Sequence, residues 1–301
     1  MIASPSARNV LDNAKRTTVN DRLLFSSYQV QAKSAIVPDT VINQPRPNAS
    51  LATEPMHILL RKLNSHHEIS AEEQDAVLSS LGPAISISRG KDIVSDGSTP
   101  QHTTVMLSGT ACRYKILPRG IRHILAFQYP GDMTDLYSYV MKKLDHAVGA
   151  LSDCTIAQIP HEQIAALGEQ YPNLQYSFWR DTMLDASISN NWILGGGRTT
   201  AERMANMLCE IFVRFNSVGL TSLGKPIPFN ATQQDLADAL GLSLVHTNKT
   251  LGALRKEGLI QSQPGTFQIL DWEGLCTAGN FQLQYLHLRS DIRADLADQE
   301  S

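Results

Sequence analysis

Residues 232–260 read TQQDLADALGLSLVHTNKTLGALRKEGLI, and this stretch decides the fold. Gly241 permits the positive φ of a tight corner between two short helices. Ser243 stands where the N-cap of the second helix belongs. Each helix has apolar positions spaced to share one face: Leu236, Ala237 and Leu240 in the first, Leu251 and Leu254 in the second. The stretch predicts a helix-turn-helix, a motif that places its second helix in the major groove of DNA.

The sequence that follows strengthens this interpretation. Residues 259–270, LIQSQPGTFQIL, read as strand, Pro-Gly turn and strand, which is the hairpin of a winged variant. Two helices of an ordinary core would show the same spacing and corner as residues 232–260. The order helix, corner, helix and hairpin favours a DNA-binding module over that alternative.

Charge is distributed unevenly along the chain, whose formal net charge is −3. Residues 56–197 hold 11 Lys and Arg against 14 Asp and Glu, whereas residues 198–261 hold 7 against 5. From Asp271 onward there are 2 against 6. The segment with the helix pair is therefore the least acidic, which suits contacts with phosphate.

Cysteine usage and hydropathy indicate a cytoplasmic protein. Cys112, Cys154, Cys209 and Cys276 show no CxxC spacing, so we expect small buried thiols in a reducing compartment rather than disulfides or a metal site. No apolar run approaches the roughly 18 residues of a membrane span, and the N-terminus lacks the pattern of a secretory signal.

The first 55 residues are rich in Ser, Asn, Gln and Pro, and we expect a disordered extension there. Met56 opens a more regular stretch, which leads to the hypothesis that it is the true translation start. A helix is expected from His57 to Leu63, and another from Ser70, where Glu73 completes a capping-box pattern. His66 and His67 are expected to be solvated loop residues rather than a metal site, because no second ligand cluster accompanies them.

Short β-runs separated by glycines follow, which predicts an antiparallel barrel or jelly roll. The runs are residues 85–88, 103–107, 111–117, 121–127 and 147–159.

A long helix is predicted from about Pro172 to Leu194. Six positions in it are spaced 3, 4, 3, 4, 3 and form a heptad seam for a parallel dimer: Tyr176, Trp179, Met183, Ala186, Asn190 and Ile193. A helix that simply packs on the barrel is the alternative. Phe178 and Ile188 lie off the seam and can cover the barrel. Gly195–Gly197 ends the helix as a hinge, and a further helix is expected over residues 201–215.

The predicted fold class is therefore α+β, with an N-terminal jelly-roll sensor domain, a dimerisation helix and a C-terminal winged helix-turn-helix domain. We place the extension at 1–55, the sensor domain at 56–164 and the dimerisation helix with its hinge at 165–197. The DNA-binding domain takes 198–275, and a C-terminal helix and tail take 276–301.

This succession resembles the Crp/Fnr family of bacterial transcription regulators over roughly residues 57–290. Its most specific parts are Pro130-Gly131-Asp132 within the barrel, residues 197–208 after the hinge, and residues 232–260. The resemblance implies a homodimeric regulator with double-stranded DNA and RNA polymerase as partners, and a small-molecule effector or none.

The chain departs from the family at the effector site. The positions that hold the ribose and the cyclic phosphate in cyclic-nucleotide-binding members look like Asp135-Leu136 and Asp145-His146 here. Asp145 would repel a phosphodiester that needs a cation, so cyclic AMP is disfavoured. No cysteine precedes Cys112, so the iron–sulfur cluster of oxygen-sensing members is not expected either. Nothing distinguishes any of the 9 histidines as a haem ligand, and no cofactor is predicted.

The second helix also differs from the family. Aligned on Gly241, the base-reading Glu and Arg of many members fall on Val245 and Lys249. Val245 can pack on a thymine methyl and Lys249 can reach guanine acceptors, although Val245 could instead belong to the helix core. His246 and Asn248 are further base-reading candidates. Thr232, Gln233 and Ser243 stand near helix N-termini and suit phosphate contacts.

We therefore expect a homodimeric transcription regulator, not an enzyme, that reads a palindromic operator with the helix starting near Ser243. Its barrel would couple a signal to DNA affinity. A constitutive DNA binder with a ligand-free barrel is one alternative, and a side-chain-filled pocket would favour it. A jelly-roll enzyme is the other, but metal-dependent cupins need a His-x-His that the chain lacks.

Overall fold

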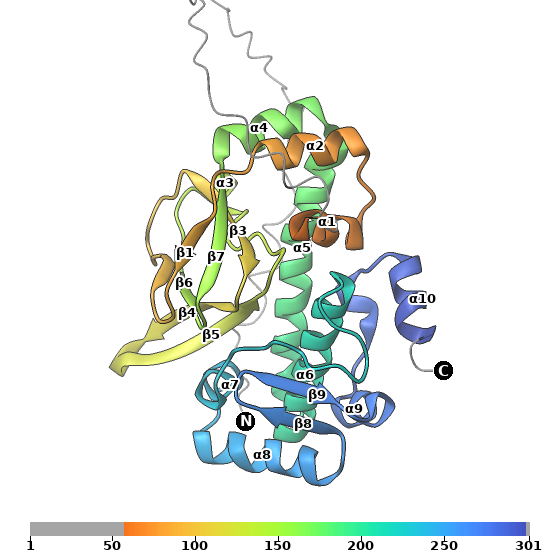
Figure 1. Ribbon diagram of the computed structural model, residues 1–301. Helices are drawn as coiled ribbons and strands as arrows, with labels where there is room; N and C mark the ends of the chain where they lie inside the picture. The colour runs from red at the N-terminus through yellow and green to blue at the C-terminus, as the bar shows by residue number, and fades with distance from the viewer. Residues whose placement is uncertain (1–56, 299–301) are drawn as a thin grey trace, which may run out of the picture. The chain divides into compact units, whose positions relative to one another are not determined.

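A computed structural model describes residues 57–298 of the chain (Figure 1). The extension predicted for residues 1–55 and the hypothetical start at Met56 lie outside the described residues. The described part contains a barrel, a long helix and a helix-turn-helix with a hairpin, in the predicted order. No helix within it is both long and apolar enough to cross a membrane.

Two short helices precede the barrel, α1 (Ile58–His66) and α2 (Ala71–Ser79). The predicted capping box starts α2: Ser70 Oγ accepts from the Glu73 N–H, and the Glu73 carboxylate accepts from the Ser70 N–H at 2.7 Å.

The prediction of solvated loop histidines is wrong for His66, and His67, which does lie in the loop after α1, is only partly exposed. His66 is the last residue of α1, and its Nδ1 lies 3.4 Å from the His287 carbonyl oxygen. The His67 ring packs edge-on against Tyr176 with 4.9 Å between the ring centroids. Both side chains are partly buried because α1 packs against the long helix.

The barrel consists of two antiparallel sheets. One has the order β1-β7-β3, formed by β1 (Ile85–Ile87), β7 (Cys154–Pro160) and β3 (His102–Ser108). The other has the order β2-β6-β4-β5, formed by β2 (Asp92–Val94), β6 (Ala147–Ala150), β4 (Ala111–Leu117) and β5 (Ile121–Gln128), with the turn η2 (Pro118–Gly120) joining the last two. Both sheets contribute to one buried apolar cluster: Met106, Ala111, Val148, Ala150, Cys154 and Ile156.

Two details of the barrel differ from the sequence prediction. The single strand expected over 147–159 is two strands, because the chain crosses from the β6 sheet to the β7 sheet at residues 151–153. Ser152 Oγ fixes that crossing by accepting from the Thr110 N–H at 3.0 Å. Strand β2 was not predicted, since three residues show no periodicity.

Helices α3 (Ser138–Met141) and α4 (His161–Gln170) precede the long helix α5 (Pro172–Leu194), whose bounds match the prediction. The sequence analysis did not foresee α4. Pro172 separates the two helices because it disfavours helical backbone in the residue before it and suits a first helical turn. Phe178 packs in a core with Val105 and Met133, and Ile188 packs in a core with Ile124 (residues of the barrel), so the prediction that both cover the barrel is confirmed.

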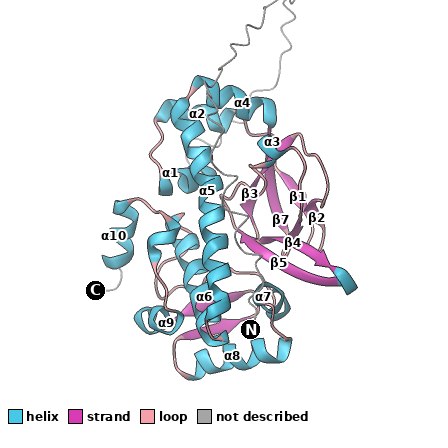
Figure 2. Cartoon of the chain, turned by 180° about the vertical axis from the view of Figure 1, so that it is seen from behind, coloured by secondary structure: helices cyan, strands magenta, loops and turns pink. Residues whose placement is uncertain are grey.

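After α5, a turn of three glycines (η3, Gly195–Gly197) leads into α6 (Thr200–Ser217). The helix-turn-helix follows as α7 (Gln233–Leu240) and α8 (Leu244–Lys256), and the hairpin as β8 (Ile260–Gln263) and β9 (Thr266–Ile269). The remaining elements are α9 (Trp272–Gly279), η4 (Leu283–Leu286) and α10 (Ser290–Asp298). Figures 1 and 2 both place the barrel strands along one side of α5, and α8 far from α4.

The barrel and the helix-turn-helix region share one apolar core. Phe127 on β5 packs edge-on against Phe229, with 5.0 Å between ring centroids, and Tyr129 lies 4.8 Å from Phe215 of α6. The same cluster of buried residues extends to Leu236 of α7. Contact between the barrel and the helix-turn-helix region therefore buries apolar residues of both.

Candidate nucleic-acid interface and barrel cavity

The corner between α7 and α8 is built as its residues predicted. Gly241 adopts a left-handed conformation with φ 64° and ψ 37°, which costs a glycine little. Ser243 Oγ caps α8 by accepting from the His246 N–H at 3.3 Å. Leu251 and Leu254 are buried, so the apolar face of α8 is directed toward α6 and α7.

The base-reading candidates lie on the opposite face of α8. Val245 is 76% exposed, which shows that it does not belong to the helix core. His246, Asn248 and Lys249 are exposed as well, whereas Thr247 between them is buried. One face of α8 thus offers an apolar group, an imidazole, an amide and an ammonium group, which are the kinds of side chain that read base edges.

The phosphate-contact candidates are exposed at the helix N-termini. Thr232 caps α7 in a reciprocal arrangement with Asp235, whose carboxylate accepts from the Thr232 N–H at 2.7 Å and from its hydroxyl at 2.6 Å. Gln233 is the first residue of α7. Ser243 is exposed but its hydroxyl is used by the cap of α8.

Sequence reasoning missed Arg255, in the last turn of α8. Its Nη1 donates to Ser262 Oγ on β8 at 3.0 Å, so it connects the second helix to the hairpin. A basic residue in a final helical turn was a usable signal, but the position of the hairpin relative to α8 was not available from the sequence.

The six seam residues share an exposed face of α5. Tyr176 is 48% exposed, Trp179 65%, Met183 64% and Ile193 76%, and Ala186 and Asn190 are exposed too. We call these six residues the α5 stripe. Leu174, Phe178, Leu184 and Ile188 on the other face are buried. A helix that only packed on the barrel would not need large apolar groups on its outer side.

The structure does not bring the four effector-pocket candidates together. Asp135 is fully buried, with Oδ1 accepting from the Thr104 N–H at 2.7 Å, and Leu136 belongs to the core beneath α1. Burial raises the pKa of Asp135 to about 7.

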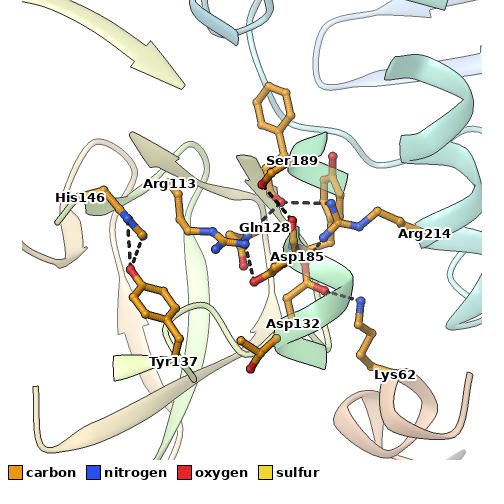
Figure 3. Close-up of polar contacts among 12 residues, drawn as sticks. Lys62, Arg113, Gln128, Asp132, Tyr137, His146, Asp185, Ser189 and Arg214 are labelled. Atoms are coloured by element: carbon orange, nitrogen blue, oxygen red, sulfur yellow. Dashed lines mark hydrogen bonds and ion pairs between the residues drawn. The ribbon is translucent and has the colours of Figure 1, made fainter. Parts of the chain in front are cut away.

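Asp145 and His146 instead line a cavity of about 550 Å³ between the barrel, the end of α5, α6 and α7. The Asp145 side chain is 88% exposed and lies 3.0 Å from His146 Nδ1. His146 is buried, and its two ring nitrogens, Nδ1 and Nε2, lie 3.1 Å and 3.0 Å from the Tyr137 hydroxyl oxygen (Figure 3). Burial, followed by the nearby Arg113 guanidinium, lowers the pKa of His146, so its ring is neutral at pH 7.

A buried ionic network surrounds the Pro-Gly-Asp turn that the sequence analysis singled out. The Asp132 carboxylate accepts from Lys62 of α1 at 3.0 Å and from Arg214 of α6 at 2.6 Å (Figure 3). Burial alone would raise the pKa of Asp132, but Arg214 and Lys62 outweigh it and hold the pKa below its usual value. The pair of Asp132 with Arg214 joins the barrel to α6, and Arg214 also lies 3.7 Å from Glu210 of the same helix.

A second ionic contact joins the barrel directly to the helix-turn-helix. Arg122 on β5 donates through Nε to Asp238 at 2.7 Å and through Nη2 to Asp235, and both carboxylates belong to α7. The Asp235 side chain is 6% exposed and that of Asp238 15%. We call this contact of Arg122 with Asp235 and Asp238 the α7 clasp.

The barrel also faces the phosphate-contact candidates. A cavity of about 620 Å³ is bordered by Thr232 and Gln233 on one side and by Ser152 and Asp153 of the barrel on another. The Asp153 carboxylate on this border would repel a phosphate group, whereas Arg89 of the barrel and Arg255 of α8, which line the same cavity, would attract one. In this arrangement the base-reading face of α8 is exposed to solvent, whereas the N-terminus of α7 borders a cavity that barrel residues also line.

An outward second helix, a hairpin beside it and a barrel joined by a long helix define a DNA-binding transcription regulator. Comparison with known families agrees: residues 202–278 match the Crp-like helix-turn-helix domain, and residues 84–171 match the cyclic nucleotide-binding domain. The chain belongs to the Crp/Fnr family of transcription regulators.

Individual relatives have low sequence identity to this chain, but the similarity covers most of its length. The chain is 25% identical over 195 residues to the nitrogen fixation regulation protein FixK of Azorhizobium caulinodans, covering 64% of this chain and 77% of the relative. It is 21% identical over 219 residues to the transcriptional activator protein Anr of Pseudomonas aeruginosa, covering 72% and 88%. The solved structure of FixK2 from Bradyrhizobium japonicum is similar in fold, with a TM-score of 0.58, 21% identity, and coverage of 65% of this chain and 96% of that one.

Proposed function

We propose that the protein acts as a homodimer that binds a palindromic operator with one α8 helix from each protomer. The observation that carries this proposal is the exposed face of α8, with Val245, His246, Asn248 and Lys249 directed outward. Two such helices must lie about 34 Å apart to enter successive major grooves.

The α5 stripe supports the dimer. Trp179, Met183 and Ile193 stay largely exposed in a single protomer, and exposed apolar groups at heptad spacing are typical of a helix that pairs with a copy of itself. Asn190 within the stripe is the kind of polar residue that fixes register in a parallel pair.

The proposal is tested by selecting bound duplexes from a random pool and then measuring their binding by fluorescence anisotropy. The expected product is an inverted repeat with half-site centres about 10 base pairs apart. A selected site without twofold symmetry, or a complex with one protomer per duplex, would contradict it.

We further infer that the barrel controls access to DNA. The α7 clasp and the shared aromatic core hold the helix-turn-helix against the barrel, and barrel residues Ser152 and Asp153 border the predicted phosphate contacts. A signal that favoured release of α7 would raise DNA affinity by changing the populations of two arrangements.

A constitutive DNA binder with a ligand-free barrel is a second candidate, and one observation favours it. Asp135 and Leu136 are packed in the barrel interior, where a ribose-binding pair would instead border a pocket. Operator affinity that stayed the same when Arg122 was replaced would support this candidate over the gated one.

Three further proposals complete the function. The relatives named as transcriptional activators support RNA polymerase as a partner, and binding to chromosomal DNA supports a cytoplasmic location.

We also propose that the protein works without cyclic AMP, an iron–sulfur cluster or haem. The position of Asp145 and the placing of the four cysteines on β4, β7, α6 and α9 support this. Equilibrium dialysis with cyclic AMP and an absorption spectrum of the anaerobically purified protein test it.

A further inference from the structure

The cavity that contains Asp145 and His146 extends well beyond the barrel. On its far side it is bordered by the glycine hinge at Gly195, by Arg198 and Arg203, and by Leu240 at the end of α7. Its volume of about 550 Å³ lies within the range of small-molecule sites, roughly 300–1,000 Å³. The cavity therefore joins the three parts of the chain whose arrangement would control DNA binding.

The charged groups around the cavity favour an anion on the hinge side. Arg113 is already paired with Asp185 at 2.7 Å. Arg198 donates to Asn191 Oδ1 at 3.4 Å and Arg203 donates to the Leu240 carbonyl oxygen at 2.6 Å, both neutral acceptors. In the described part of the chain, neither of these two guanidinium groups has a carboxylate within 4.0 Å. Each guanidinium has five N–H donors, so most remain available.

The rest of the wall is mixed: His123, Tyr137, His146, Ser189, Asn191 and Asn206 add polar groups, and one part is apolar or aromatic. Ile124 and Ala126 of β5, Trp192 of α5 and Met207 of α6 line it, and three of these four are buried. Asp145, the carboxylate among the lining residues, is at the barrel end and points largely into solvent. The cavity has two available guanidinium groups at one end and apolar side chains beside them. It therefore fits a molecule that has an anionic group at one end and an apolar body.

We propose that this cavity binds a small organic acid, with its carboxylate held by Arg198 and Arg203 and its apolar body against Trp192 and Met207. The anion-binding end lies at the hinge rather than at Asp145-His146, the barrel positions that the family resemblance pointed to. Arginine suits this role because its planar fork matches the two oxygens of a carboxylate.

Occupancy would reach α7 through Arg203. The guanidinium that would receive the carboxylate is the one that donates to the Leu240 carbonyl oxygen, next to the Gly241 corner. A ligand that drew Arg203 away would remove one of the hydrogen bonds that hold α7. The effect of the ligand on DNA binding therefore rests on the proposed gating, whereas binding of the ligand does not.

The binding test uses two fluorescent probes of similar body, the anionic 8-anilinonaphthalene-1-sulfonate and the neutral N-phenyl-1-naphthylamine. With the full chain, we expect the anionic probe to bind at one site per protomer and to be displaced by octanoate. Inorganic phosphate, which lacks an apolar body, should not displace it. Displacement by cyclic AMP but not by octanoate would overturn the assignment of a carboxylate ligand.

Two variants locate the site. Arg198→Gln with Arg203→Gln should weaken the anionic probe about tenfold or more, because charged hydrogen bonds are lost, and leave the neutral probe within about twofold. Arg198→Gln alone loses one long hydrogen bond, to Asn191, and an electrostatic interaction with the Glu202 carboxylate, so it should fold normally and still weaken the anionic probe. Arg119→Gln, an exposed arginine on η2, is the charge-matched control. Equal binding to all variants, or equal loss of both probes, would refute the site.

Operator binding is measured separately in the presence of octanoate. A change in operator affinity that disappears in the Arg198→Gln variant supports the coupling. If octanoate binds with the expected arginine dependence but operator affinity stays constant, the site is correct and the proposed gating is wrong. If operator DNA is not bound under any condition, the proposed function fails while the probe result stands.

Discussion

Replacing Arg122 with glutamine should strengthen binding to the operator, although the protein loses a positive charge. The change removes the α7 clasp, in which Arg122 contacts Asp235 and Asp238. The N-cap of α7 would survive, because Asp235 also accepts from Thr232, and Asp238 would still accept from Gln234 at 2.7 Å. The variant therefore perturbs the docking of α7 and not its folding.

The magnitude follows from the burial of the groups. Hydrogen bonds to charged groups contribute about 1.5–3 kcal/mol each, but the Arg122 side chain is 31% exposed, and solvent screening reduces the value. We therefore expect the whole clasp to contribute about 2 kcal/mol. If the docked arrangement predominates in the free protein, that loss raises the fraction of released protein, and so the apparent affinity, about thirtyfold.

The assay is fluorescence anisotropy with a duplex selected by the wild-type protein, at fixed ionic strength because DNA affinity depends on salt. Arg119→Gln, three residues away on the same hairpin, removes the same charge without touching α7 and should weaken binding slightly. An Arg122→Gln variant that binds like Arg119→Gln, or more weakly, would refute the clasp as a restraint on DNA binding.

Three further outcomes are expected. Lys249→Ala should relax base preference at one position of each half-site at a cost of about 1–3 kcal/mol, whereas an equal loss on all duplexes would make Lys249 a phosphate contact. Trp179→Glu with Met183→Glu places like charges in the α5 stripe and should weaken self-association by about 3 kcal/mol or more in analytical ultracentrifugation, with unchanged circular dichroism. Asp135→Asn tests the effect of pH on stability. Because burial raises the pKa of Asp135 to about 7, the folded protein holds that proton between about pH 4 and 7 while the unfolded chain has lost it, so wild-type stability falls as pH rises through this window. The variant should gain up to about 4 kcal/mol in urea unfolding at pH 8 and little at pH 4, and an equal gain at both would contradict the assignment.

Local features of the fold could be predicted because neighbouring residues determine them. The Ser70–Glu73 cap, the left-handed Gly241 and the Ser243 cap each depend on atoms a few residues apart. Heptad spacing alone predicted that the face of α5 with Trp179 is directed away from the barrel, and Trp179 is exposed. Strand β2 and helix α4 were missed because three residues carry no period and because Pro172 was taken as the first helical signal after the barrel.

The contacts that matter most for the proposed mechanism could not be predicted. Arg122 and Asp235 are 113 positions apart, and Asp132 and Arg214 are 82 apart. A single sequence contains no signal that pairs charges across such separations. The same limit applies to the proposed ligand site: Asp145 lines that cavity, but no pattern in the sequence connects Arg198 and Arg203 with it.

The contact of Phe127 with Phe229 restricts how this protein can evolve. The glycine turn after α5 looks like a natural junction at which recombination could exchange one sensor for another. The half of the chain beyond that turn, if acquired alone, would arrive with Phe215 and Phe229 lacking Tyr129 and Phe127, their partners on the barrel side. Such an exchange would succeed only if the matching aromatic surface moved with it, so the two halves would have to change together.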